Sequence, residues 1–135
     1  AYGFVLRSGG KTAVLSGDTG ICEALIEAGQ GANLLLHEVY LHREMTLIPG
    51  QRSAATVAAT AAYHTLSGEV GDIARRMGAG ALALTHFVPP EFDRAALLAE
   101  VAERYDGPVF VGEDLMGFDL ASGDVTLGDF RARLL

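Results

Sequence analysis

The sequence has 135 residues, of which 50% are hydrophobic and 20% charged, so it is long and apolar enough to fold as one domain with a buried core. Its formal net charge of -7 opposes binding to nucleic acid or to an anionic membrane surface, and no apolar run is long enough to cross a bilayer. The single cysteine, Cys22, excludes an intrachain disulfide framework and favours a reducing compartment, so we expect a cytoplasmic protein.

The first part of the chain predicts a hairpin, a helix and a buried strand. Residues 3–7 and 12–15 are typical of two strands joined by a glycine-rich turn. Small residues follow at 16–20 (Ser-Gly-Asp-Thr-Gly), and apolar residues at helical spacing then predict a helix that Gly29 or Gly31 ends. Residues 34–36 are an apolar run too short for a helix, so we expect a buried strand that ends at His37-Glu38.

The second part alternates helices and strands. The pattern is lost over residues 40–51, and residues 53–62 are rich in alanine and compatible with a helix. The later elements are predicted in turn as a helix at 67–78, a strand at 81–85 that ends at His86, a helix at 91–105, a strand at 109–111 and a closing hairpin at 115–124.

This alternation predicts an α/β fold with a parallel or mixed sheet, and residues 1–135 are expected to form a single domain. About four predicted helices accompany about six or seven strands, fewer than would cover both faces of a sheet. We therefore expect helices on one face and a second face left at least partly uncovered.

Polar side chains follow three of the predicted strands. Asp18 follows the second strand, His37-Glu38 the third and His86 the fourth. Because loops at the carboxyl ends of strands converge at one edge of an open α/β sheet, we expect Asp18, His86 and either His37 or Glu38 to share that edge. His64 precedes a predicted helix and is placed to reach the same edge.

Each of these residues also has a purely structural interpretation. An aspartate before Thr-Gly is typical of a turn or a helix cap, and a histidine at a strand end is more often hydrogen-bonded in the core than bound to a metal. Glu38 is also consistent with a solvated strand end, and His42 with a surface residue. His86 directly follows a buried strand, so we expect it to be nearly buried and hydrogen-bonded.

Imidazole and carboxylate groups without a thiolate cluster suit zinc or a similar ion. Asp18 and His86 with one optional partner nevertheless fall short of a two-metal centre. A phosphate-binding loop at residues 16–20 is disfavoured because the motif lacks its lysine, and a nucleophilic Cys22 because no basic neighbour would activate it.

Four motifs together resemble the second half of the metallo-β-lactamase fold, in the branch that holds ribonuclease Z and arylsulfatase-like hydrolases. They are Ser-Gly-Asp-Thr-Gly at 16–20, Leu-Leu-Leu-His-Glu at 34–38, Tyr-His-Thr at 63–65 and Leu-Thr-His-Phe at 84–87. The resemblance implies that residues 1–135 form the C-terminal half of an αββα sandwich, a mixed sheet with helices on one face.

The resemblance also implies a metal centre, normally two zinc ions, with iron or manganese as alternatives. Asp18 corresponds to the aspartate that bridges both metals and His86 to the histidine that completes the second metal's shell. His64 corresponds to a catalytic histidine that assists proton transfer to the leaving group. Glu38 is implied to be a supporting carboxylate at most, and His37 is not a ligand in this family. The remaining ligands belong to a His-x-His-x-Asp-His motif and one further histidine, which this chain lacks.

The resemblance implies a metal-dependent hydrolase that attacks its substrate with metal-bound hydroxide. Three departures from the ribonuclease Z pattern bear on the substrate: residues 88–90 are Val-Pro-Pro instead of Ser-x-Arg-Tyr, residues 65–66 are Thr-Leu instead of Ser-Thr, and Leu15 stands where a proton-relay glutamate is expected. With the acidic charge, these departures favour a small-molecule ester over nucleic acid. Two alternatives stay open: a ribonuclease Z-type phosphodiesterase, and a non-catalytic interaction or regulatory half-domain.

The missing N-terminal half is expected either in the same polypeptide or in another chain, and a homodimer is one form of the second arrangement. It would pack on the uncovered sheet face, since an apolar face of that size is an aggregation liability in water. We expect the isolated chain to be inactive.

Overall fold

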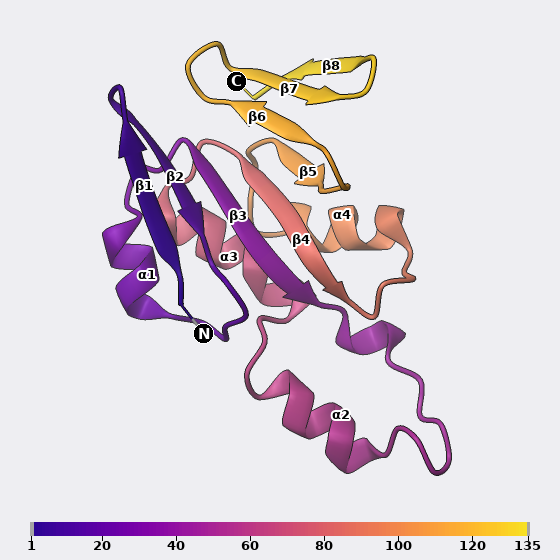
Figure 1. Cartoon of the computed structure of the whole chain (residues 1–135). Coiled ribbons are helices and arrows are strands. Elements are labelled where there is room, and N and C mark those ends of the chain that lie inside the picture. The colour runs from indigo at the N-terminus through magenta and orange to yellow at the C-terminus, as the bar shows by residue number, and fades with distance from the viewer. Residues whose placement is uncertain (1, 135) are drawn as a thin grey trace.

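A five-stranded mixed sheet forms the body of the protein in the computed structural model, which describes residues 2–134 (Figure 1). The strand order is β1-β2-β3-β4-β5, with β1 antiparallel to β2 and the other neighbours parallel. The bounds are Phe4–Ser8 for β1, Lys11–Leu15 for β2, Leu34–Tyr40 for β3, Leu82–Val88 for β4 and Val109–Val111 for β5. Parallel pairing of β2, β3 and β4 brings their carboxyl ends to one edge of the sheet, which confirms the α/β prediction.

Three helices cover one face of this sheet: α1 (Glu23–Ala28), α3 (Ser67–Met77) and α4 (Arg94–Ala102) (Figure 1). The apolar residues of α3 recur at helical spacing, and the helix ends at Gly78, whose φ of 63° suits glycine. The main core joins the three helices to the strands through buried residues such as Ile26, Val70, Ile73, Met77, Leu97, Val101, Val14, Leu35, Val39, Leu82 and Leu84.

A second, three-stranded antiparallel sheet covers part of the opposite face. It consists of β6 (Gly117–Asp119), β7 (Asp124–Leu127) and β8 (Phe130–Arg133), where the sequence predicted a simple hairpin. Val125 and Leu134 pack there against Leu34 and Ala83 of the main sheet. The third strand forms because β7 and β8 pair in register around the turn at Gly128.

The rest of that face, over β1, is uncovered. Phe4 pairs with Leu15 and Leu6 with Ala13, and these partners lie beside Leu36 and Leu34, so all of them share the face opposite the helices. Phe4 and Leu6 are each 57% exposed. We call the surface formed by Phe4 and Leu6 the open face. Its exposure confirms the expectation that helices cover one face only.

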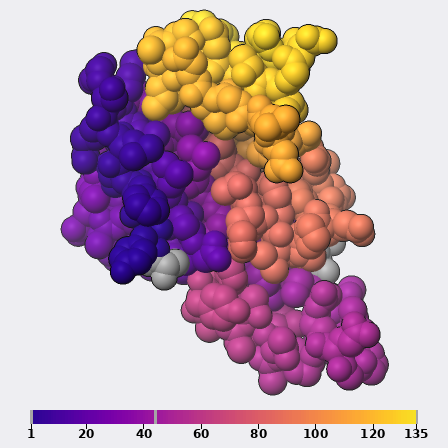
Figure 2. Space-filling model, viewed as in Figure 1, coloured from indigo at the N-terminus to yellow at the C-terminus, as the bar shows by residue number. Residues whose placement is uncertain are grey.

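An arm of residues 41–63 stands out from the body, as Figures 1 and 2 show. It contains the short 3-10 helix η1 (His42–Glu44), a loop closed by a bridge between Ile48 and Arg52, and α2 (Ala54–Ala61). Ser53 caps α2 by accepting a hydrogen bond from the Thr56 amide at 3.1 Å, which confirms the predicted helix. None of the residues of α2 is buried.

Two strands run further than predicted. β3 continues to Tyr40, so His37 and Glu38 lie within the strand, and β4 continues past His86 to Val88. The β3–β4 pairing shifts register between Glu38 and Val39, which leaves His86 as the extra residue of a bulge with a φ of 46°. Among residues 2–134, no helix is both long and apolar enough to cross a membrane.

Candidate metal and proton-transfer site

Asp18 lies in the loop that follows β2, at the carboxyl edge of the sheet. Gly17, with a φ of 62°, turns the chain there, and a Cβ at this position would collide with the carbonyl oxygen of Tyr2. Thr19, which follows Asp18, anchors the loop, because its carbonyl accepts a hydrogen bond from the Thr65 hydroxyl at 2.7 Å. The Asp18 side chain is 54% exposed and therefore free to meet a ligand.

His86 faces Asp18 across this edge. Its Nε2 lies 3.7 Å from Oδ2 of Asp18, and its side chain is 47% exposed. The expectation that His86 would be nearly buried and hydrogen-bonded is wrong, since the bulge in β4 turns its side chain toward solvent. The expectation that the two residues would meet at one edge is confirmed by this distance.

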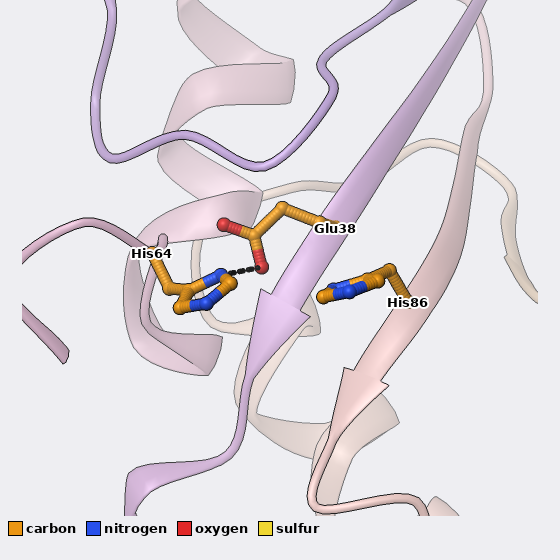
Figure 3. A group of neighbouring side chains, drawn as sticks. All are labelled: Glu38, His64 and His86. Carbon is orange, nitrogen blue, oxygen red and sulfur yellow. Dashed lines mark ion pairs between the residues drawn. The ribbon is translucent and has the colours of Figure 1, made fainter. Parts of the chain in front are cut away.

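Glu38 and His64 form a buried pair beside them (Figure 3). Oε2 of Glu38 lies 3.0 Å from Nδ1 of His64, although the angles fall outside those of a hydrogen bond. The other carboxylate oxygen, Oε1, accepts hydrogen bonds from the Thr65 amide at 2.8 Å and the Thr19 amide at 3.4 Å. Glu38 therefore presents its charge to Nδ1 of His64, and both side chains are almost fully buried.

Aromatic packing holds the His64 ring. The ring lies nearly parallel to those of Tyr40 and His86, with centroids 5.9 and 5.7 Å away. Tyr40 is buried, and burial raises the pKa of its phenol, so the hydroxyl stays protonated and donates to the Val57 carbonyl at 3.3 Å. His64 is thus positioned by Tyr40 of β3 and His86 of β4 as well as by Glu38.

His37 points away from the site. It alternates with Leu35 and Val39, which belong to the helix-covered core, and it is buried. Burial lowers the pKa of the imidazole, and a hydrogen bond donated by Nδ1 to the Glu38 carbonyl at 2.8 Å opposes that shift in part. His37 is therefore a structural residue.

The donor atoms fit a metal ion at Asp18 and His86. Two ligands of one tetrahedral zinc, each at about 2.0–2.2 Å, lie about 3.4 Å apart, close to the 3.7 Å seen here. The two residues line a hollow of about 280 Å³ together with Gly17, Leu36 and Glu38. This hollow exceeds the volume of a single ion and leaves room for further ligands and substrate.

Glu38, His64 and His86 also form a cluster whose donor atoms lie within 4.8 Å of one another. This cluster is less suited to a metal than Asp18 and His86 are, because both oxygens of Glu38 already face N–H groups or the His64 ring. Catalytic zinc takes about three protein ligands. Asp18 and His86 are two ligands, so a complete zinc shell would need at least one more ligand.

The role of Glu38 is the feature that sequence reasoning missed. The resemblance to ribonuclease Z predicts the proton-relay glutamate at the position of Leu15, whereas the structure has a carboxylate beside His64 at Glu38. The signal was the alternation of residues 34–38, which places Leu34, Leu36 and Glu38 on one face if the strand continues.

No protein-family model matches the chain. It is 36% identical over 115 residues to the ribonuclease Z of Mycobacterium tuberculosis (strain ATCC 25618 / H37Rv), a match that covers 84% of this chain and 41% of that protein. It is 38% identical over 104 residues to the zinc phosphodiesterase ELAC protein 2 homolog of Caenorhabditis elegans, covering 77% of this chain and 11% of that protein. The chain thus spans less than half the length of these relatives.

Two solved structures have a similar fold. The metallo-β-lactamase fold protein YhfI from Bacillus subtilis matches with a TM-score of 0.62 and 29% identity, over 83% of this chain and 41% of that one. Human tRNase Z, short form, matches with a TM-score of 0.52 and 21% identity, over 84% of this chain and 35% of that one. The chain therefore has part of the metallo-β-lactamase fold, and the predicted resemblance to the branch of ribonuclease Z is confirmed.

Proposed function

We propose that this chain supplies half of a metal-dependent phosphodiesterase of the ribonuclease Z type. The observation that carries the proposal is the convergence at one sheet edge of Asp18 with His86, and of Glu38 with His64. The first pair suits a metal ion and the second suits proton transfer. Relatives named ribonuclease Z and zinc phosphodiesterase support the same activity.

Asp18 and His86 would hold zinc in this scheme. Bound zinc would supply Lewis acidity and a water that is deprotonated at neutral pH. Asp18 uses its exposed carboxylate and His86 its Nε2, the atom that faces Asp18. We include two zinc ions in this proposal. Ligands outside this chain would complete their coordination.

His64 would donate a proton to the leaving oxygen. The Glu38 carboxylate faces Nδ1 and so orients the ring, which leaves Nε2 as the atom that would donate. Because the pair is buried, this interaction is screened little by solvent. Glu38 acts here as a positioning residue for His64.

The substrate in this proposal is RNA rather than a small ester. One of the three sequence departures that favoured an ester was the absent relay glutamate, and Glu38 now stands beside His64. The charge of -7 belongs to a chain that spans less than half of the relatives described above, so it does not decide the charge around a complete active site.

A small ester remains the second candidate substrate. Glu113 and Asp114 line a further hollow that also contains His86, and carboxylates there disfavour a polyanion on that side. A purely non-catalytic half-domain has less support, because it would have no need for both pairs of residues at one edge.

The other half of the site would pack on the open face. Phe4 and Leu6 are exposed there, and β1 is an edge strand with no further neighbour among the described residues. Association with that half, in the same polypeptide or in another chain, would bury this apolar surface and bring the remaining metal ligands.

Asp18→Ala in the complete protein tests this proposal. We expect zinc per molecule, measured by mass spectrometry, to fall, and cleavage of a precursor-tRNA-like oligoribonucleotide to drop to background. Asp106→Ala, which removes an exposed carboxylate distant from the site, should change neither. Unchanged zinc content in Asp18→Ala would refute its role as a ligand. Hydrolysis of p-nitrophenyl esters without cleavage of RNA by the wild type would favour the second candidate.

A further inference from the structure

Tyr63 is an exposed aromatic residue beside the proposed proton donor. It directly precedes His64 in the chain, its ring centroid lies 4.8 Å from that of His64, and the residue is 58% exposed. We propose that Tyr63 is a stacking platform for the nucleobase next to the scissile phosphodiester. This inference rests on the proposed function and adds to it a residue that binds a base.

The exposure of Tyr63 contrasts with its neighbour Tyr40. Tyr40 also packs on His64, but it is buried and its hydroxyl is bound to Val57. An aromatic side chain gains most of its stabilisation from burial of its large surface. Tyr63 leaves more than half of that surface in water, directly beside the proposed proton donor His64.

The distribution of charge favours binding of RNA on the side of the site where Tyr63 lies. The chain has 17 acidic residues, yet none lies between Met45 and Gly68, and this segment carries Arg52. On the other side of His86, a hollow of about 210 Å³ is lined by Glu113 and Asp114. Carboxylates repel a phosphate backbone, so an RNA strand would meet less repulsion along residues 45–63 of the arm, where Tyr63 lies.

Base stacking suits this position chemically. Every base presents a π-face, so one aromatic ring binds any base and no hydrogen-bond readout is needed. Such a contact holds substrate and transition state alike, so it is expected to set KM more than kcat. Loss of a residue that only positioned His64 would instead lower kcat and leave KM largely unchanged.

The test compares Tyr63→Phe, Tyr63→Leu and Tyr63→Ala in the complete protein. Two oligoribonucleotides are used that differ only in an intact or abasic residue next to the cleaved bond. We expect the leucine and alanine variants to raise KM by about 5- to 150-fold on the intact oligonucleotide and to leave the abasic one unaffected. The phenylalanine variant should keep the wild-type KM, because its ring is retained.

Two outcomes would overturn the inference. One is an equal loss on the intact and abasic oligonucleotides, and the other is a fall in kcat alone, which would make Tyr63 a positioning residue for His64. If the wild type cleaves neither oligonucleotide, the proposed function fails. Binding of the two oligonucleotides, measured by fluorescence anisotropy, then tests separately whether Tyr63 stacks on a base. Tighter binding of the intact oligonucleotide that Tyr63→Ala abolishes supports stacking, and equal binding of the two contradicts it.

Discussion

The carboxylate of Glu38 faces two other segments of the chain, the loop that contains Thr19 and residues 64–65. It accepts hydrogen bonds from the amides of Thr19 and Thr65 and presents its other oxygen to His64, while its own backbone amide donates to the Ser16 hydroxyl at 3.0 Å. A buried carboxylate without partners would be strongly destabilising, so these contacts explain how a charge can lie at this position. The same contacts fix the loop of Asp18 and the start of α3 relative to each other.

Glu38→Gln tests the part played by this charge. The amide oxygen can still accept from Thr65, but an uncharged NH₂ group replaces the carboxylate oxygen that faces Nδ1 of His64. We expect kcat of the complete protein to fall, by no more than the about 10²- to 10⁴-fold that general acid–base help contributes. Zinc content should be unchanged. Glu23→Gln, at an exposed ion pair with Arg76, is the matched control, and an unaffected kcat in Glu38→Gln would remove Glu38 from the proposed mechanism.

At the scale of the element, the bulge in β4 is what makes His86 available. Regular pairing would place residue 86 in the ladder between β3 and β4, whereas the register shift after Glu38 leaves it unpaired and turned toward Asp18. The φ of 46° at His86 is in the left-handed region, which disfavours residues with a Cβ. The site therefore contains a local backbone conformation that is unfavourable by itself.

Comparison of His86→Asn with His86→Ala tests this strain. Both variants lose the imidazole, but asparagine tolerates the left-handed conformation better than alanine does. We expect His86→Asn to be the more stable by about 1 kcal/mol in its free energy of unfolding, measured by urea denaturation. Leu115, with a φ of 68° and 95% exposure, provides a control site where asparagine should likewise be favoured over alanine. Equal stabilities at position 86 would show that the bulge is not strained.

At the scale of the whole molecule, the two faces of the main sheet are covered by different elements and to different extents. Helices cover one face, whereas the β6–β8 sheet covers only the part of the other face near Leu34 and Ala83. The open face over β1 then combines exposed Phe4 and Leu6 with the free edge of a strand, a combination that promotes association between chains.

Leu6→Lys tests the open face. In the isolated chain we expect this change to reduce concentration-dependent association, measured by light scattering, with little effect on the free energy of unfolding, because the side chain is already exposed. In the complete protein the same change should destabilise the fold, since it places a charge against the other half. Leu47→Lys, at a residue on the arm with 60% exposure, is the matched control. Equal association of wild type and Leu6→Lys would contradict the prediction that the open face promotes association between chains.

Much of the site followed from local pattern and a general rule of topology. The small-residue turn at 16–20 and the apolar run before His86 each predicted a strand end, and parallel strands bring their carboxyl ends to one edge. Asp18 and His86 were therefore expected to meet, and they do so at 3.7 Å. The helix at α3 was likewise predicted because its spacing of apolar residues and its terminal glycine are local signals.

The sequence by itself determined the α/β alternation, the helix-covered face and the candidate residues Asp18, His64 and His86, since these depend on periodicity and on residues near one another in the chain. Only the tertiary structure decided that β4 carries a bulge, that Glu38 faces His64 and that a third strand joins the C-terminal hairpin. Each of these depends on which residues lie opposite one another in space, as when the amide of Thr65 meets the carboxylate of Glu38 from 27 residues away. Local propensity does not encode such register, because a shift of one residue between strands leaves every local pattern unchanged and moves every side chain to the other face.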